Sequence, residues 1–204
     1  MELTERELTN PWEGVLISPA AGADVGVLVL AGSSGRIERE RARILAEQGI
    51  ATLAIRWFGG LGQSPGICEV PLETFIDAVD LLHAGGARRI GILGVSKGAE
   101  AALLTAVHDP RVDVVIALSP TSRVWCNVGP GRDGERLPYR SSWTWREQPL
   151  PFVPMDDSWA DLLLVAGGDD AMWPSLPFAE RLAQRRRSAG ASNICWRRLK
   201  NARS

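Results

Sequence analysis

Gly94-Val95-Ser96-Lys97-Gly98 is the stretch that decides the fold of this chain, because of what stands on either side of it. Residues 89–93 before it form a short apolar run typical of a buried strand, and residues 99–107 after it are strong helix formers. The glycines allow a strand and a helix to cross in a tight turn without steric clash. The first N–H groups of such a helix face the space beside the serine, where they can stabilise a developing negative charge.

A G-x-S-x-G turn between a strand and a helix is the nucleophile elbow of the α/β-hydrolase fold. We therefore predict an α/β-hydrolase fold in which Ser96 is the catalytic nucleophile. The backbone N–H of Lys97 is then the first donor to the oxyanion. The alternative is a purely structural turn, since a bare G-x-S-x-G occurs by chance in many proteins.

Apolar runs alternate with amphipathic segments along the chain, which predicts a mostly parallel sheet with helices on both faces. Strands are expected at residues 25–30, 51–55, 89–93, 112–118, 162–166 and 193–199. Helices are expected at residues 36–48, from Pro71 to residue 84, at 99–107 and at 176–187. The 204 residues fit a single domain over 1–204.

Residues 121–158 interrupt this alternation and are rich in Pro, Gly, Arg and Trp. The segment follows the strand expected at 112–118, where hydrolases of this fold carry caps, and long irregular connections are often functional. We predict a cap-like insertion that lines an acyl pocket. The alternative is a surface excursion whose tryptophans pack on the core. The tryptophans concerned are Trp125, Trp143, Trp145 and Trp159.

Composition argues against several classes of partner. The formal net charge of −1 gives no electrostatic reason to expect nucleic acid or membrane lipid as a partner. Three widely spaced cysteines fit a reducing cytoplasm better than a disulfide framework, and with two histidines they give little material for a metal site. We expect a cytoplasmic protein with no metal and no cofactor. The sequence leaves the oligomeric state open.

The second oxyanion donor is expected in the loop after the first predicted strand, which reads Ala31-Gly32-Ser33-Ser34-Gly35. We favour the backbone N–H of Ser33, with Ser34 as the alternative. The same small residues could also form nothing more than a strand-to-helix turn.

The acid is expected after a late strand, where the chain reads Gly167-Gly168-Asp169-Asp170-Ala171-Met172-Trp173-Pro174. A carboxylate at this point lies at the carboxyl edge of the sheet, where α/β proteins bind their ligands. We prefer Asp170, because hydrolases commonly place the acid three residues after the first glycine and four before a proline. Asp169 is then a turn or capping residue. A structural role for both aspartates stays open.

The sequence offers no candidate for the catalytic base at the position where this fold carries it. Hydrolases of this fold place the catalytic histidine after the acid, on the loop that follows the last strand. The sequence has no histidine after Asp170, and Lys200 to Ser204 occupy the place where that loop begins. His83 and His108 each close a predicted helix, a position that favours a partial positive charge for structural reasons. A chain truncated before its histidine, a natural non-catalytic protein and a histidine from another chain all remain open.

The elbow and the acid motif together resemble one known family. Residues 94–100 are similar to the elbow of the acyl-CoA thioesterase and bile acid-CoA:amino acid N-acyltransferase family, and residues 167–173 are similar to its acid motif. The resemblance covers about residues 25–199, the catalytic α/β-hydrolase domain of that family.

The resemblance implies a Ser–Asp–His triad in which Ser96 takes the acyl group from an acyl-CoA thioester and water or an amine accepts it. It also raises the question of whether the Lys97 side chain contacts a CoA phosphate or is simply solvated. Two other readings stay open. One is an ester hydrolase of the dienelactone type, and the other is a non-catalytic binding protein that keeps the fold without the histidine.

Overall fold

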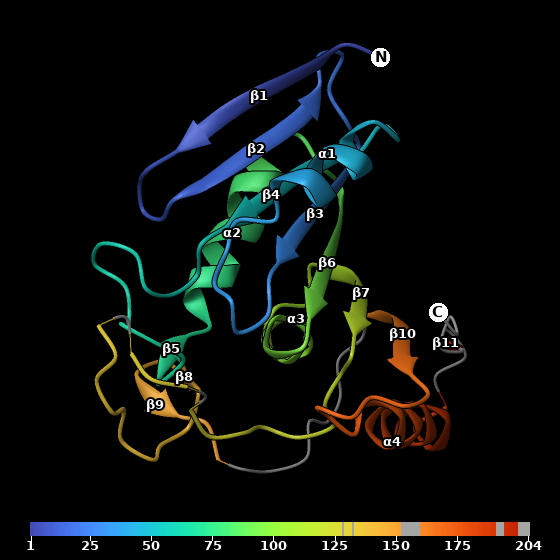
Figure 1. The fold of residues 1–204 in the computed structure, drawn as a ribbon. Coiled ribbons are helices and arrows are strands. Elements are labelled where there is room, and N and C mark those ends of the chain that lie inside the picture. The colour runs from blue at the N-terminus through green and yellow to red at the C-terminus, as the bar shows by residue number, and fades with distance from the viewer. Residues whose placement is uncertain (128, 132, 152–159, 191–193, 200–204) are drawn as a thin grey trace.

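The computed structural model describes residues 1–127, 129–131, 133–151, 160–190 and 194–199. Within these residues the centre is an eight-stranded sheet in the order β1-β2-β4-β3-β6-β7-β10-β11 (Figure 1). Its strands are β1 (Leu3–Leu8), β2 (Gly14–Pro19), β3 (Val25–Leu30), β4 (Ala51–Ile55), β6 (Arg89–Val95), β7 (Val112–Leu118), β10 (Asp161–Gly167) and β11 (Ile194–Leu199). The helices are α1 (Arg39–Ala46), α2 (Glu73–Ala84), α3 (Lys97–His108) and α4 (Ser175–Ser188).

The sheet is parallel from β4 through β11, and only the β1–β2 hairpin at one edge runs antiparallel to its neighbours. The strands β3 and β6 are buried on both faces, as parallel strands covered by helices are. The predicted architecture, a mostly parallel sheet with helices on both faces, is therefore confirmed.

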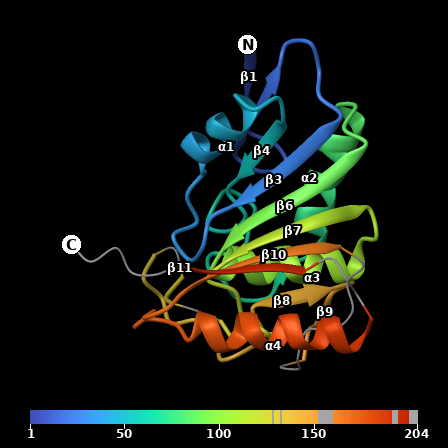
Figure 2. The ribbon, with the colours of Figure 1, turned by 90° about the vertical axis from the view of Figure 1, so that its right-hand side faces the viewer.

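Alternate side chains of each strand face two separate cores. Leu28 and Leu30 of β3 pack in the larger core with apolar residues of α2, α3 and α4. Val27 and Val29 pack on the other face, in a smaller core that α1 closes with Ala42. Figure 2 shows α1 and α2 on opposite sides of the sheet.

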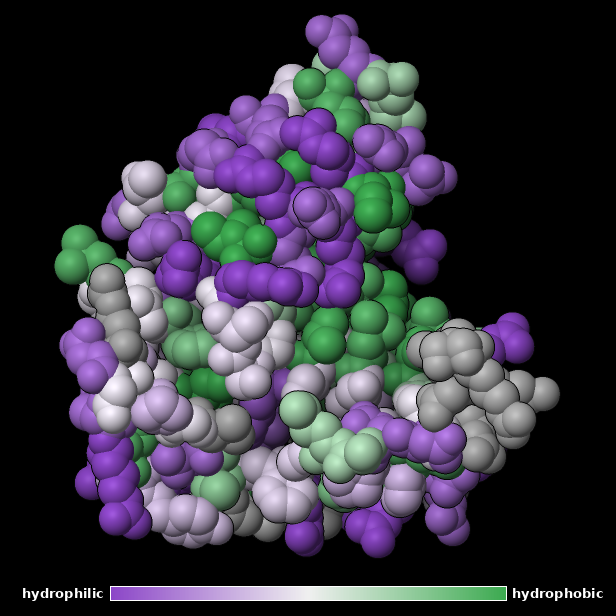
Figure 3. All heavy atoms as spheres, in the orientation of Figure 1, coloured by the Kyte–Doolittle hydropathy of each residue, from purple (hydrophilic) through white to green (hydrophobic). Residues whose placement is uncertain are grey.

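The face that α1 covers is only partly screened within the described chain. Beyond α1 the space-filling view shows apolar side chains over β6 and β7 (Figure 3). Ile116 and Leu118 of β7 are half-buried there, packed against the smaller core. Across the described residues no helix is both long and apolar enough to span a lipid bilayer.

Two predicted helix starts are wrong. Pro71 does not begin a helix, because it lies in the short strand β5 (Val70–Pro71), where neighbouring N–H groups donate to the carbonyls of residues 142 and 144. Proline is tolerated there because its missing N–H is not needed, and α2 begins two residues later at Glu73. The helix predicted at 36–48 is shorter, since α1 begins at Arg39 after a turn and ends at Ala46.

The segment predicted as a cap-like insertion contains β8 (Trp143–Trp145) and β9 (Gln148–Pro149), which form a small sheet with β5. Residues 152–158 of that segment, and Trp159 beside it, lie outside the described residues. So do residue 193, the first of the last predicted strand, and residues 200–204, where the resemblance places the start of the histidine loop.

Candidate active site

Ser96 stands in a sharp turn at the junction of β6 and α3. Its backbone angles are φ 52° and ψ −115°, a region that a residue with a Cβ rarely occupies. The turn is held because the Ser96 N–H donates to the Leu118 carbonyl of β7 at 2.8 Å, and the Ser96 carbonyl accepts from Glu100 N at 3.1 Å. Strained residues of this kind cluster at functional sites. The half-buried serine remains reachable from solvent.

The glycines on either side of Ser96 are there because no side chain fits. A Cβ on Gly94 would lie 2.1 Å from the Gly98 carbonyl oxygen, and one on Gly98 would lie 2.3 Å from the Ala31 carbonyl oxygen. Both obstacles are backbone atoms and cannot rotate away. The G-x-S-x-G pattern is thus a steric requirement of this turn, as the sequence predicts.

The loop that follows β3 lies directly against the nucleophile. A Cβ on Gly32 would be 3.3 Å from the Ser96 Cβ, and the Gly35 N–H closes a turn onto the Gly32 carbonyl at 3.2 Å. Ser33 and Ser34 occupy the two central positions of this turn, and both are exposed. The structure therefore brings the predicted second donor segment to Ser96.

Lys97 begins α3, so its N–H belongs to the first helical turn, where backbone donors have no partner within the helix. Ser96 therefore has the Gly32–Gly35 turn beside it and the start of α3 directly after it. That arrangement suits a negatively charged oxygen.

Asp170 follows β10, and its carboxylate is held in one orientation. Oδ1 accepts from Met172 N at 3.2 Å and from Trp173 N at 3.0 Å, while Oδ2 accepts from the Ser175 hydroxyl at 2.9 Å. Asp170 thus holds the turn that precedes α4, a turn role that the sequence suggests for Asp169. A carboxylate accepts about four hydrogen bonds, so Oδ2 can still receive an N–H from another group.

Strand order brings Ser96, the Gly32 turn and Asp170 to one edge of the sheet. All three follow the carboxyl ends of parallel strands, with β3 beside β6 and with β7 alone between β6 and β10. Two strand spacings separate the serine strand from the aspartate strand, about 10 Å. One further side chain fits across that gap.

Neither of the two histidines lies at this edge. His108 ends α3 and is about 18 Å along that helix from Ser96. It stacks on Trp145 with ring centroids 4.6 Å apart, and burial lowers its pKa. His83 ends α2, before β6 begins, and β6 is about 23 Å long. Both interpretations of these residues as structural agree with their positions.

The Lys97 side chain is neither solvated nor available to a CoA phosphate, so both suggestions for it are wrong. Its ammonium is buried, 2.9 Å from Glu100 Oε2 and 2.8 Å from the Ser142 hydroxyl. Burial lowers the pKa of Lys97 and raises the pKa of Glu100, because loss of water outweighs the attraction between the two charges. Sequence reasoning missed Glu100, although its three-residue spacing from Lys97 was a signal for an ion pair on one helix face.

This buried ion pair fastens the 121–145 segment to the elbow helix. The other Glu100 oxygen, Oε1, accepts from Trp125 N and from Trp143 Nε1, each at 2.8 Å. The Trp125 ring in turn packs edge-on against Trp173, with centroids 5.0 Å apart. Trp125 therefore links the helix that carries the nucleophile to the loop that carries Asp170. Within the described residues no group of three His, Cys, Asp or Glu side chains is placed to hold a metal ion.

Comparison with known proteins supports the fold and the resemblance. No protein-family model matches the chain. Acyl-coenzyme A amino acid N-acyltransferase 2 of Rattus norvegicus is 26% identical over 201 residues, 88% of this chain and 48% of the relative. Mitochondrial acyl-coenzyme A thioesterase 2 of Mus musculus is 23% identical over 206 residues, 89% of this chain and 46% of the relative. The chain thus spans about half the length of the curated relatives it matches.

Solved structures that are similar to this chain support the α/β-hydrolase fold. An esterase from Pyrococcus furiosus superimposes with a TM-score of 0.66 at 15% identity, over 98% of this chain and 82% of that one. The chain has the α/β-hydrolase fold, and its similarity to acyl-CoA thioesterases and N-acyltransferases, at low identity, is confirmed.

Proposed function

We propose that this chain is a serine-dependent hydrolase of acyl-CoA thioesters that works through an acyl-Ser96 intermediate. The observation that carries the proposal is the backbone of Ser96, held at φ 52° against the Gly32 turn and at the start of α3. Strained backbone of this kind clusters at functional sites, and we infer that here it presents the Ser96 hydroxyl. The names of the relatives support the choice of an acyl-CoA substrate.

The first half-reaction forms the acyl-enzyme. Ser96 Oγ attacks the thioester carbonyl, whose oxygen becomes negative and is stabilised by backbone N–H groups of Lys97 and of the Ser33–Ser34 turn. The C–S bond then breaks, and the acyl group stays on Ser96 while the thiolate leaves. In the second half-reaction water attacks the acyl-Ser96 ester and releases a carboxylic acid.

The serine proton must pass to a base, and Asp170 is proposed to orient that base. The described residues bring no imidazole to the gap between Ser96 and Asp170. In the first half-reaction this favours thioesters over oxygen esters, because a thiol of pKa about 8.5 leaves as its anion without a proton. The second half-reaction breaks the same acyl-Ser96 ester for both substrates. An alkoxide is far more basic and needs a general acid.

Thiol release from acyl-CoAs of increasing chain length tests the proposal. We expect release by the natural chain, loss of release in Ser96→Ala, and no loss in the control Ser18→Ala on the distant strand β2. Matched oxygen esters should form the acyl-enzyme more slowly. Equal thiol release by the natural chain and Ser96→Ala would overturn the role of the serine.

A non-catalytic protein that binds acyl-CoA is the second candidate. The positions of His83 and His108, each at a helix end away from Ser96, favour it. Micromolar binding of a non-hydrolysable acyl-CoA ether without thiol release from the thioester would select this function over hydrolysis.

A further inference from the structure

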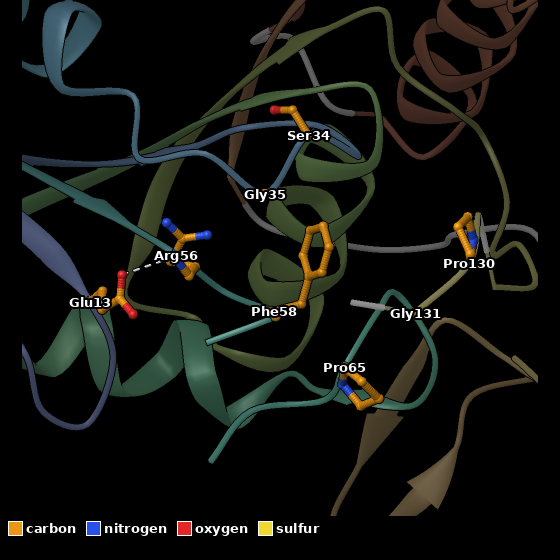
Figure 4. Close-up of a pocket in the computed structure, with 9 residues that line it drawn as sticks. Glu13, Ser34, Gly35, Arg56, Phe58, Pro65, Pro130 and Gly131 are labelled. Carbon is orange, nitrogen blue, oxygen red and sulfur yellow. Dashed lines mark hydrogen bonds and ion pairs between the residues drawn. The ribbon is translucent and has the colours of Figure 1, made fainter. Parts of the chain in front are cut away.

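A cavity of about 320 Å³ borders the Gly32–Gly35 turn, which lies against Ser96. Ser34 and Gly35 of that turn form one wall, and Arg56 and Phe58, just after β4, form another (Figure 4). Pro130, from the segment predicted as an insertion, also lines it. Its volume is in the range of small-molecule sites, and it opens at the sheet edge that carries the nucleophile.

Arg56 places a cation at this cavity, paired with Glu13. Its Nε donates to Glu13 Oε2 at 3.1 Å, and its backbone N–H donates to the Glu13 carbonyl at 2.8 Å. Glu13 is the single side chain that pairs with this guanidinium in the described part of the chain. The terminal nitrogens point away from Glu13, so their N–H donors remain for a ligand (Figure 4).

Phe58 couples the position of Arg56 to the turn beside Ser96. Gly35 has φ 61°, and a Cβ there would lie 2.7 Å from Phe58 Cζ, so the ring packs directly on the turn. Trp57, between the two residues, donates from Nε1 to the Ala31 carbonyl at 3.2 Å. The wall that carries Arg56 is thereby tied at two points to the loop that lies against the nucleophile.

We propose that this cavity binds an anionic oxygen group of the substrate, a carboxylate or a phosphate, through the terminal nitrogens of Arg56. A planar guanidinium held from one side by a carboxylate is suited to grip such a group with two parallel hydrogen bonds. The cavity lies on the β3 and β4 side of Ser96, opposite Asp170, so it can hold one end of a substrate whose carbonyl reaches Ser96. The inference rests on the proposed function and deepens it.

The anion has two sources, a carboxylate at the far end of the acyl chain or a phosphate of the CoA carrier. Four thioesters separate them: a neutral acyl group and an ω-carboxyacyl group, each on CoA and on phosphate-free N-acetylcysteamine. In Arg56→Gln we expect KM to rise by about 10- to 100-fold for every substrate that carries the bound anion. The neutral N-acetylcysteamine thioester should show no change. Arg88→Gln, at the opposite edge and paired with Asp24, is the matched control.

If KM rises only for the two CoA thioesters, the anion that Arg56 binds is a phosphate. If KM rises only for the two carboxyacyl thioesters, the anion is the carboxylate. The same change for all four substrates, or no change for any, overturns the proposal. Calorimetric binding of CoA and of a dicarboxylate to Ser96→Ala, with and without Arg56→Gln, separates the two claims. If binding depends on Arg56 while the natural chain shows no turnover, anion binding in the cavity is supported and the proposed hydrolysis is refuted. If turnover is the same with and without Arg56→Gln, anion binding in the cavity is refuted and the proposed hydrolysis stands.

Discussion

Replacing Glu100 by glutamine tests the buried ion pair that holds the elbow helix to the Trp-rich segment. Glu100 is 1% exposed and Lys97 is 5% exposed, so the substitution leaves a cation in the interior without its counter-charge. Glutamine has nearly the same shape and keeps an oxygen for Trp125 N and Trp143 Nε1. The loss is therefore one of charge rather than of packing.

The expected cost follows from the surroundings of the Lys97 ammonium. Breaking a buried pair by removing one partner costs about 3–5 kcal/mol. Lys97 keeps two neutral acceptors, the Ser142 hydroxyl at 2.8 Å and the Cys126 carbonyl at 3.3 Å, which places the loss near the lower end. We expect Glu100→Gln to lower the free energy of unfolding by about 3 kcal/mol. In a chain of this length that lowers Tm by about 6–12 °C.

Urea denaturation at pH 7, followed by tryptophan fluorescence, measures this loss. The matched variant is Lys97→Met with Glu100→Gln, which removes both charges and should recover more than half of the lost stability. A loss below about 1 kcal/mol in Glu100→Gln, or a double variant no more stable than the single one, would refute the reasoning, because neither fits a desolvated cation.

Three further predictions concern the base, the pH dependence and the elbow. Added imidazole should raise thiol release by the natural chain and not by Ser96→Ala; no increase would mean that another group already takes the proton. Burial lowers the pKa of His108, so stability should fall as pH drops below about 6.5 through that lowered value. His108→Phe, which keeps the stack on Trp145, should flatten this slope in denaturation curves between pH 7.5 and 5.5. Gly98→Ala should cost about 3 kcal/mol or more in urea denaturation, because its Cβ meets the Ala31 carbonyl at 2.3 Å; near-native stability would contradict that clash.

The parallel core was predictable because its signals are local. Residues 25–30 and 90–95 are continuous apolar runs, and five consecutive residues, 94–98, specify the elbow between β6 and α3. Its glycines have no substitute, since backbone atoms occupy the places of their side chains. Patterns of this strength need no knowledge of what lies across the sheet.

The N-terminal hairpin was not predicted because β1 carries no such signal. Leu3–Leu8 reads Leu-Thr-Glu-Arg-Glu-Leu, and four of its residues are exposed. It forms an edge strand through its pairing with β2 and through ion pairs that join Glu5 and Glu7 to Arg39 of α1. Arg39 is more than thirty residues away in the chain from both glutamates, so only the folded structure shows these ion pairs.

The side chains around the site were harder to predict than the nucleophile. The roles of Glu100 and Arg56 depend on residues 125, 143 and 13, which the fold brings together from distant parts of the sequence. For Asp170 the sequence suggests its place after β10, whereas its hydrogen bonds with Trp173 N and the Ser175 hydroxyl needed the structure. The roles of Ser96, Ser33, Lys97 and Asp170 in catalysis remain predictions.

The most direct measurement of the central claim is the mass of the protein after brief incubation with an acyl-CoA and an acid quench, followed by peptide mapping. We expect one added acyl group, located on the peptide that contains Ser96 and absent from Ser96→Ala. An acyl group that persists in Ser96→Ala, or its absence from the Ser96 peptide of the natural chain, would contradict it.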